Sequence, residues 1–222
     1  MFRIRIQNKK KCIWYCSAVV SFLLFLLLLG WTNHLANTQD AQQMAGRWSE
    51  KKDVAQISCF FSSKAEVTED TIQSFEYSLK NVLQEASITE TSENPSARLW
   101  VDAYSADGKI TLVNGKNTLD ANAIGIGGDF FMFHPLKLIT GAYFSGNDLM
   151  QDYCIIDQDA AWQLFGSNDV VGMTVYIGNV PHIVTGVVQR PDSRMDKAAG
   201  LNSTVVYVSY ETLSAYGTNN GI

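Results

Sequence analysis

The 222-residue sequence has few cysteines, prolines and basic residues, and each shortage excludes a class of protein. Four prolines and 16 glycines without a regular period exclude collagen-like and proline-rich linker proteins. The net charge is −5, whereas a nucleic-acid binder carries an excess of basic residues, so we expect no nucleic-acid partner. Aromatic residues, at 11%, are too frequent for a disordered chain. The length allows a core that needs no disulfide or metal to fold.

The patterns typical of metal and nucleotide sites are also missing. None of the three histidines, His34, His134 and His182, has a second ligand at a spacing such as HxxxH or HExxH. The run Gly125-Ile126-Gly127-Gly128 begins like a dinucleotide fingerprint, but Phe130 stands where the third glycine is required. We therefore interpret it as a tight turn and expect no cofactor and no metal.

Signatures of hydrolytic enzymes are equally scarce. The sequence has no GxSxG motif, and neither Cys59 nor Cys154 lies in a catalytic signature. Asp152, Asp157 and Asp159 cluster, but the last two are explained more simply as residues at a helix start. We predict no catalytic residue, although an anchored hydrolase that uses Asp157, Asp159 or His182 stays as an alternative if these side chains converge.

One long segment lacks charge altogether. Residues 12–31 contain no charged side chain, and twenty helical residues span the roughly 30 Å hydrocarbon core of a bilayer. The preceding residues 1–11 hold five cations and no acid, which predicts a cytoplasmic N-terminus. A cleaved signal peptide is the alternative, but its apolar core would be about 7–15 residues long and followed by a small-x-small cleavage site. We favour an uncleaved transmembrane helix in the plasma membrane, with residues 12–31 in contact with lipid.

The remainder of the chain has a different charge balance. All 22 acidic residues follow the apolar segment but only 12 of the 17 cations do, which gives a formal charge of −10. An acidic domain of this kind is not expected to bind anionic lipid. Cys59 and Cys154 could pair if the fold brings them together, but two buried free thiols are the simpler expectation.

The pattern of apolar residues predicts a juxtamembrane helix over 32–53 and an extracytoplasmic domain over 54–222. In this domain strands and helices alternate irregularly, which indicates an α+β fold with a mixed sheet. The predicted strands are 54–62, 97–106, 109–113, 119–128, 154–156, 175–177, 182–189 and 204–209. The predicted helices are 69–86, one that starts at Asp157 or Asp159 and ends at Gly166, and 211–216. Two-residue turns are expected at Asp107-Gly108 and at Gly178-Asn179.

A chained pattern from Asp129 to Val188 resembles the periplasmic core domain of MacB-like and FtsX-like ABC transporter permeases. An aromatic segment and a glycine turn come first, followed by a strand–helix that ends in Leu-Phe-Gly and a glycine-containing hairpin. The positions that carry the resemblance are Gly141, Phe144, Asp157, Ala161, Leu164, Phe165, Gly166, Gly172 and Gly186. We expect Ala161, Leu164 and Phe165 of the predicted helix to be buried against the strands over 175–177 and 183–188. Ala142 departs from the family, which usually has arginine there, and the sequence after residue 216 lacks the family's three further membrane helices. The chain therefore resembles the N-terminal part of a permease, or a permease remnant.

The resemblance implies a non-enzymatic role. Such a domain would relay conformational change from a cytoplasmic ABC ATPase subunit to an outside partner or substrate. A membrane-fusion-type adaptor and a second permease copy are the further partners that it implies. A membrane-anchored ligand-binding or sensor domain without transport is the alternative.

Overall fold

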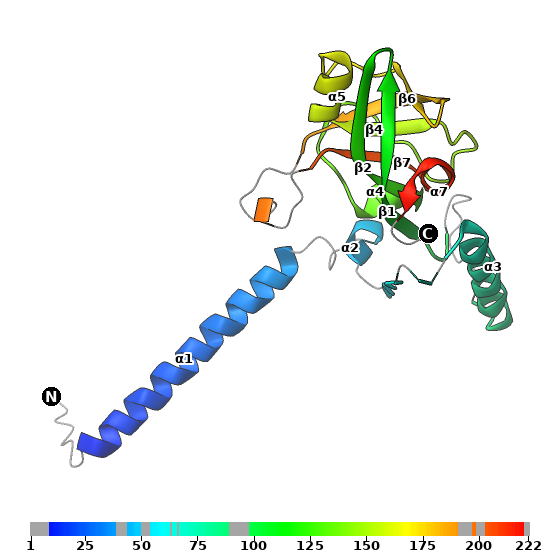
Figure 1. Ribbon diagram of the computed structural model, residues 1–222. Helices are drawn as coiled ribbons and strands as arrows, with labels where there is room; N and C mark the ends of the chain where they lie inside the picture. The colour runs from blue at the N-terminus through cyan, green and yellow to red at the C-terminus, as the bar shows by residue number, and fades with distance from the viewer. Residues whose placement is uncertain are drawn as a thin grey trace. The chain divides into compact units, whose positions relative to one another are not determined.

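The computed structural model describes residues 9–38, 44–49, 54–62, 64–65, 67–88, 98–190, 197–198 and 203–219. The chain forms two compact units, Met1–Gln56 and Ile57–Ile222. Figure 1 shows the elements of both units along the chain.

The first unit is helical. Helix α1 (Lys9–Thr38) contains the segment Lys11–Leu35, which has a mean hydropathy of 2.5 and is long and apolar enough to cross a membrane. Helix α2 (Met44–Trp48) is separate and short, and Ser49 is already outside it. The predicted helix over 32–53 is therefore present in part, and residues 39–43 and 50–53 lie outside the described residues.

The second unit is built on a mixed sheet, as predicted. Its strands are β1 (Ala103–Asn114), β2 (Asn117–Gly128), β3 (Leu138–Gly141), β4 (Tyr153–Asp157), β5 (Thr174–Ile177), β6 (Val180–Val188), β7 (Val205–Ser209) and β8 (Thr218–Asn219). The order β2-β7-β4-β6-β5-β1 closes on itself because β1 also pairs with β2. Two neighbouring pairs, β2 with β7 and β4 with β6, are parallel, and the rest are antiparallel.

Helices α4 (Phe130–Phe133), α5 (Gln158–Phe165) and α7 (Tyr210–Tyr216) pack on this sheet, and the core forms two clusters. Helix α3 (Glu69–Glu85) has no buried residue. The larger cluster packs α5 and α7 against the strands and includes Ile156, Leu164 and Leu213. The smaller cluster, with Ile155 and Phe131, lies on the other face. Strand β4 is thus buried on both faces, which explains why Cys154–Ile156 is an unbroken apolar run.

The long β1–β2 hairpin, which is prominent in Figure 1, corrects one predicted turn. Asp107 and Gly108 lie inside β1, and Gly108 is paired with Ala123 on one side and Asn219 on the other. The chain turns instead at Gly115-Lys116, where Gly115 has φ of 60°. Glycine at the first position of a two-residue turn supplies the positive φ that such a hairpin requires. Strand β1 starts at Ala103, so the predicted strand over 97–106 began too early.

Local signals predicted several other elements correctly. The β5–β6 hairpin turns at Gly178 and Asn179, which have φ of 55° and 68°. Helix α5 begins after its N-cap Asp157 and ends at Gly166 in the left-handed conformation. Helix α3 follows the N-cap Thr68, as expected.

The predicted strand over 54–62 is wrong. Residues 55–62 are not part of any strand among the described residues, and Ile57 and Phe60 are 87% and 95% exposed. Alternating apolar residues favour a strand, but a strand also needs a partner for its backbone groups. Cys59 and Cys154 are both free, as predicted, but only Cys154 is buried. Cys59 is exposed, so the expectation of a buried thiol is wrong at that position.

Candidate functional site

The Asp157 carboxylate is a structural group. It lies at the junction of β4 and α5 and is 2% exposed. Its Oδ1 accepts a hydrogen bond from the backbone amide of Ala160 at 2.7 Å. Its Oδ2 accepts from the Arg190 guanidinium at 2.7 and 3.0 Å and from the amide of Val205 at 3.0 Å. These four bonds occupy the oxygens that a nucleophile or general base would need free.

Asp159 belongs to the same cluster. Its Oδ2 lies 2.6 Å from Nη1 of Arg190, whose Nη2 also donates to Thr204 Oγ1 at 3.1 Å. Arg190 therefore joins the start of α5 to the end of β6 and the start of β7. The predicted role of both aspartates as helix-start residues accounts for their positions.

His182 lies elsewhere and is also enclosed. Its ring nitrogens are 3.0 Å from the carbonyl oxygen of Val180 and 3.2 Å from Thr212 Oγ1, and the ring is 1% exposed. Burial lowers its pKa. On the parallel β4–β6 ladder Asp157 is level with Val188, six residues and thus roughly 20 Å along the strand from His182. The side chains that a hydrolase would need do not converge.

His134 completes the set of predicted candidates, and it belongs to an aromatic cluster. Its ring stacks on Phe130 with 4.6 Å between the ring centroids. Phe131 stacks on Tyr143 at the same separation and meets Phe144 edge to face. The aromatic segment noted in the sequence thus forms part of the smaller core cluster. Asp152, the last acidic candidate, has a buried Oδ1 for which the described part of the chain offers no hydrogen-bond partner.

Most of the positions that carry the family resemblance are explained by core packing or by backbone conformation. Ala161 and Leu164 are buried in the larger core cluster, and Phe144 in the smaller one. Gly141 has φ of 85°, and a Cβ there would lie 2.1 Å from the carbonyl oxygen of Thr185, so only glycine fits between β3 and β6. The remaining glycines of the pattern are Gly166 and Gly172, both with positive φ, and Gly186, which is buried in β6.

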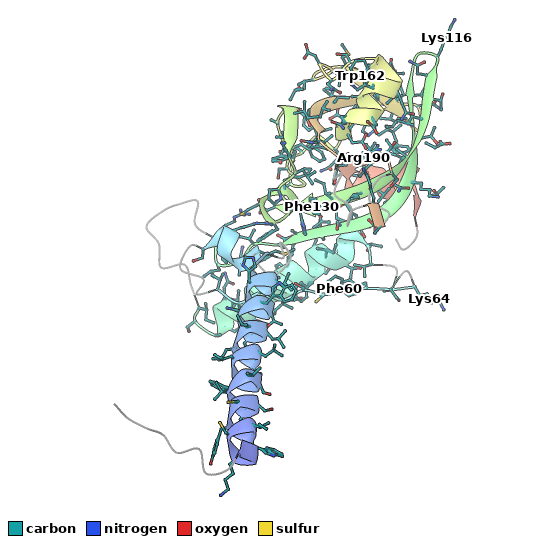
Figure 2. All side chains as sticks on the ribbon, turned by 90° about the vertical axis from the view of Figure 1, so that its left-hand side faces the viewer. Phe60, Lys64, Lys116, Phe130, Trp162 and Arg190 are labelled. Atoms are coloured by element: carbon teal, nitrogen blue, oxygen red, sulfur yellow. The ribbon has the colours of Figure 1, made fainter. Side chains whose placement is uncertain are left out.

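The burial of Phe165 differs from what the sequence predicts. The sequence predicted a buried aromatic at the end of α5, packed against β5 and β6. Phe165 is only half-buried, and α5 packs mainly on β2, with further contacts to β4, β1 and β6. Near the end of α5, the carbonyl oxygen of Leu164 accepts hydrogen bonds from Asn114 and Asn117 at the tip of the β1–β2 hairpin. Figure 2 shows Trp162 of α5 at the same end as Lys116 of that tip.

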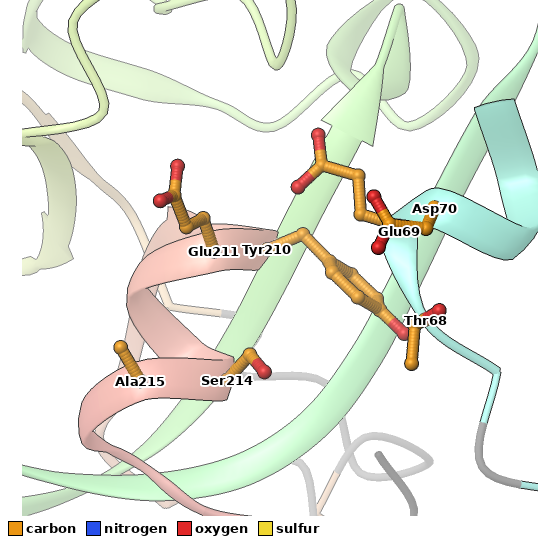
Figure 3. A pocket seen from close by; sticks show the side chains of 7 residues that line it. All are labelled: Thr68, Glu69, Asp70, Tyr210, Glu211, Ser214 and Ala215. Carbon is orange, nitrogen blue, oxygen red and sulfur yellow. The ribbon is translucent and has the colours of Figure 1, made fainter.

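A shallow pocket of about 240 Å³ lies between the start of α3 and α7, and no sequence pattern predicted it. Figure 3 shows the side chains that line it: Thr68, Glu69, Asp70, Tyr210, Glu211, Ser214 and Ala215. The hydroxyl of Tyr210 donates to the carbonyl oxygen of Val67 at 2.7 Å and thereby holds the residues that precede α3. Three carboxylates make this recess acidic.

Further acidic groups lie along α3. The pKa of Glu76 is raised to about 7, first by burial and then by the neighbouring carboxyl group of Asp102. Tyr104 donates to Glu69 Oε1 at 3.5 Å, and Arg98 is bound to Asp129 at 2.7 Å. In the described part of the chain no group of three or more histidine, cysteine or acidic side chains is arranged to hold a metal ion.

The region around α3 also exposes apolar side chains. Helix α3 has no buried residue, and Phe75 and Val82 are mostly exposed. Phe60 and Phe61 precede it in the extended segment, and Figure 2 places Phe60 at the opposite end of the unit from Lys116.

Comparisons with known proteins agree on one family. The model of the MacB-like periplasmic core domain matches residues 20–221. A macrolide export ATP-binding/permease protein MacB from Chromobacterium violaceum is 32% identical over 99 residues, which are 44% of this chain and 15% of that protein. The Pasteurella multocida MacB is 30% identical over 98 residues, 43% of this chain and 14% of that protein. The matched part of the chain thus spans less than a fifth of either relative.

Solved structures with a similar arrangement include two transporter domains. The periplasmic region of MacB from Actinobacillus actinomycetemcomitans has a TM-score of 0.41 and 24% identity, and the match covers 56% of this chain and 57% of that one. The extracellular domain of the noncanonic ABC-type transporter YknZ from Gram-positive bacteria has a TM-score of 0.41 and 22% identity, over 55% of this chain and 63% of that one.

Proposed function

The chain belongs to the MacB-like periplasmic core domain family, and from this we propose that it supplies the extracytoplasmic domain and first transmembrane helix of an ABC transporter permease. The observation that carries the proposal is the family match over residues 20–221 in a chain whose helix α1 can span a membrane. A basic tail over 1–11, a transmembrane helix over 12–31, a juxtamembrane segment over 32–53 and the domain over 54–222 make up the proposed layout.

The proposed orientation places the N-terminus in the cytoplasm. Five cations precede the apolar segment and every acid follows it, a distribution that favours retention of the basic end inside. The plasma membrane is the expected location, with residues 12–31 in contact with lipid.

The domain acts in this proposal as a mechanical relay. A cytoplasmic ABC ATPase subunit supplies the free energy, and the domain passes the resulting movement to a substrate or to a membrane-fusion-type adaptor outside. The fixed hydrogen bonds of Asp157, Asp159 and His182 support a non-catalytic role, because each group is occupied in holding elements together. Pairing of two permease copies would give the complex its symmetry.

Co-isolation of the full chain from native membranes in mild detergent tests this function. We expect an ABC ATPase to co-purify in a fixed ratio, and a tagged single-span protein of another family, isolated in parallel, to lack it. A chain that is isolated from intact membranes without any ATPase would contradict the proposal and favour the sensor alternative.

A further inference from the structure

The segment Ile57–Phe61 of the second unit has the sequence of a strand but no strand beside it. Ile57, Cys59 and Phe61 alternate with Ser58 and Phe60, so the first three would lie on one face of a strand. The described part of the chain assigns the segment to no helix or strand, and Ile57, Phe60 and Phe61 are 87%, 95% and 68% exposed. An exposed segment rich in β-branched and aromatic side chains is suited to pair with another strand.

One edge of this segment has backbone groups available for pairing. Among the described residues, no backbone hydrogen bond involves Ile57, Cys59 or Phe61. Because these residues alternate, their amide and carbonyl groups point to the same edge of an extended chain. This edge is therefore open to a strand from another chain.

The segment is complementary to itself when two copies run antiparallel with Cys59 opposite Cys59. In this register Ile57 of each copy is opposite Phe61 of the other, a β-branched and aromatic pair of the kind that stabilises sheets. A slip by one residue would set Cys59 opposite Ser58 and separate Ile57 from Phe61. A twofold axis then passes between the two Cys59 residues, as in an isologous dimer.

The distribution of charge favours a second copy at this place. The sequence after residue 31 carries a formal charge of −10, so two copies repel each other at long range. Residues 54–62 contain no charged side chain. Two copies can therefore pair along this segment without bringing like charges opposite each other.

A membrane anchor would make such a short pairing effective. A two-stranded ribbon is marginally stable by itself in water. Helix α1 can span a membrane, and the same length of chain separates it from the segment in both copies. Two copies inserted in the same direction are thus held at one membrane face, which raises their effective concentration for each other.

We propose that Ile57–Phe61 pairs antiparallel with the same segment of a second copy, with the two Cys59 residues opposite each other. The inference rests on the membrane anchor of the proposed function and adds a surface at which two copies join. Cys59 forms a hydrogen-bonded pair in this register, and the Cα atoms of such a pair lie about 5.5 Å apart, within reach of a disulfide. The two Ile57 residues are offset by four positions, roughly 14 Å along the strand, which is beyond that reach.

Disulfide crosslinking of the full chain in native membranes tests the proposal. Cys12 and Cys16 are replaced by serine throughout, and copper phenanthroline with dissolved oxygen is the oxidant. We expect Cys59 to crosslink the chain into a dimer. Reactivity of the buried Cys154 toward maleimide only after denaturation shows that each variant is folded.

The register is tested with two differently tagged copies produced together, both with Cys59→Ser. One copy carries Ile57→Cys and the other Phe61→Cys. We expect the mixed dimer to form at least about ten times faster than the dimer of either variant with itself, because only the mixed pair is opposite in this register. The self-pairs are the matched controls, since they contain the same exposed thiols.

Three outcomes would overturn the proposal while Cys154 remains shielded. They are the absence of a Cys59 dimer, a Cys59 disulfide to a protein of another mass, and equal rates for mixed and self dimers. Co-isolation of the ATPase is a separate result. An ATPase that co-purifies without a Cys59 dimer removes this inference alone, and a Cys59 dimer without an ATPase contradicts the permease function alone.

Discussion

The Arg190 guanidinium lies 2.7 Å from the Asp157 carboxylate, and both side chains are largely withdrawn from solvent. This pair joins the end of β6 to the β4–α5 junction, and Asp157 also bonds the first amide of β7. A carboxylate that the sequence alone leaves as a catalytic candidate is thus the centre of a structural junction.

Replacement of Asp157 should therefore destabilise the domain. Asp157→Ala removes the N-cap of α5 and leaves the Arg190 charge without its buried partner, so we expect a loss of about 3–5 kcal/mol in the free energy of unfolding. Asp159→Ala is the matched control, because Asp159 is 46% exposed, and it should cost less than about 1 kcal/mol. Urea unfolding of the full chain measures both, and equal losses would contradict this account of the junction.

Alanine substitutions at the end of α5 should distinguish how much two neighbouring residues contribute to stability. Leu164→Ala removes a side chain that is 1% exposed in the larger core and should cost about 2–5 kcal/mol. Phe165→Ala should cost less, because Phe165 is half-buried at the margin of that cluster. Thermal melting of the two variants gives the order, and a larger loss for Phe165→Ala would show that the aromatic ring is the main anchor of the helix.

Acid should weaken the contact between β6 and α7. Burial lowers the pKa of His182 in the folded chain, so the unfolded chain takes up a proton first as the pH falls. The stability contributed by neutral His182 is complete above pH 6.5 and is lost as the pH drops below that value. The limiting slope is about 1.4 kcal/mol per pH unit for one proton. Urea unfolding between pH 5 and pH 7 measures it, and His182→Gln should have a smaller slope. An identical slope in parent and variant would assign the acid sensitivity to other groups.

Cys59 and Cys154 give a test of the proposed orientation. Cys59 is exposed and Cys154 is buried, so an impermeant maleimide should label Cys59 in intact cells and reach Cys154 only after denaturation. Cys59→Ser is the control, and a cysteine introduced at Gln7 should be labelled only after the membrane is permeabilised. Labelling at position 7 alone in intact cells would reverse the proposed topology.

Elements with local signals could be predicted from the sequence. The β5–β6 turn requires positive φ at two residues, and Gly178-Asn179 supplies it within the turn itself. Asp157 and Gly166 likewise mark the two ends of α5 next to its first and last turns. These features need no knowledge of distant parts of the chain.

Features that depend on distant partners were missed. Alternation at 54–62 favours a strand, but no neighbouring strand within the described residues pairs with it. Gly108 resembles a turn residue until its partners Ala123 and Asn219 are known. The pocket at α3 depends on a hydrogen bond between Tyr210 and Val67, which are 143 residues apart. No local pattern indicates such a pair.

The coupling of the extracytoplasmic domain to a cytoplasmic ATPase is the central claim, and a distance that responds to ATP tests it most directly. Spin labels at Leu35→Cys in α1 and Lys116→Cys at the β1–β2 tip, with Cys12, Cys16 and Cys59 replaced by serine, report on the complex with its ATPase in nanodiscs. We predict that ATP shifts the distance distribution and that an ATPase variant unable to bind ATP abolishes the shift. An identical distribution with and without ATP, in a complex that hydrolyses ATP, would contradict the relay.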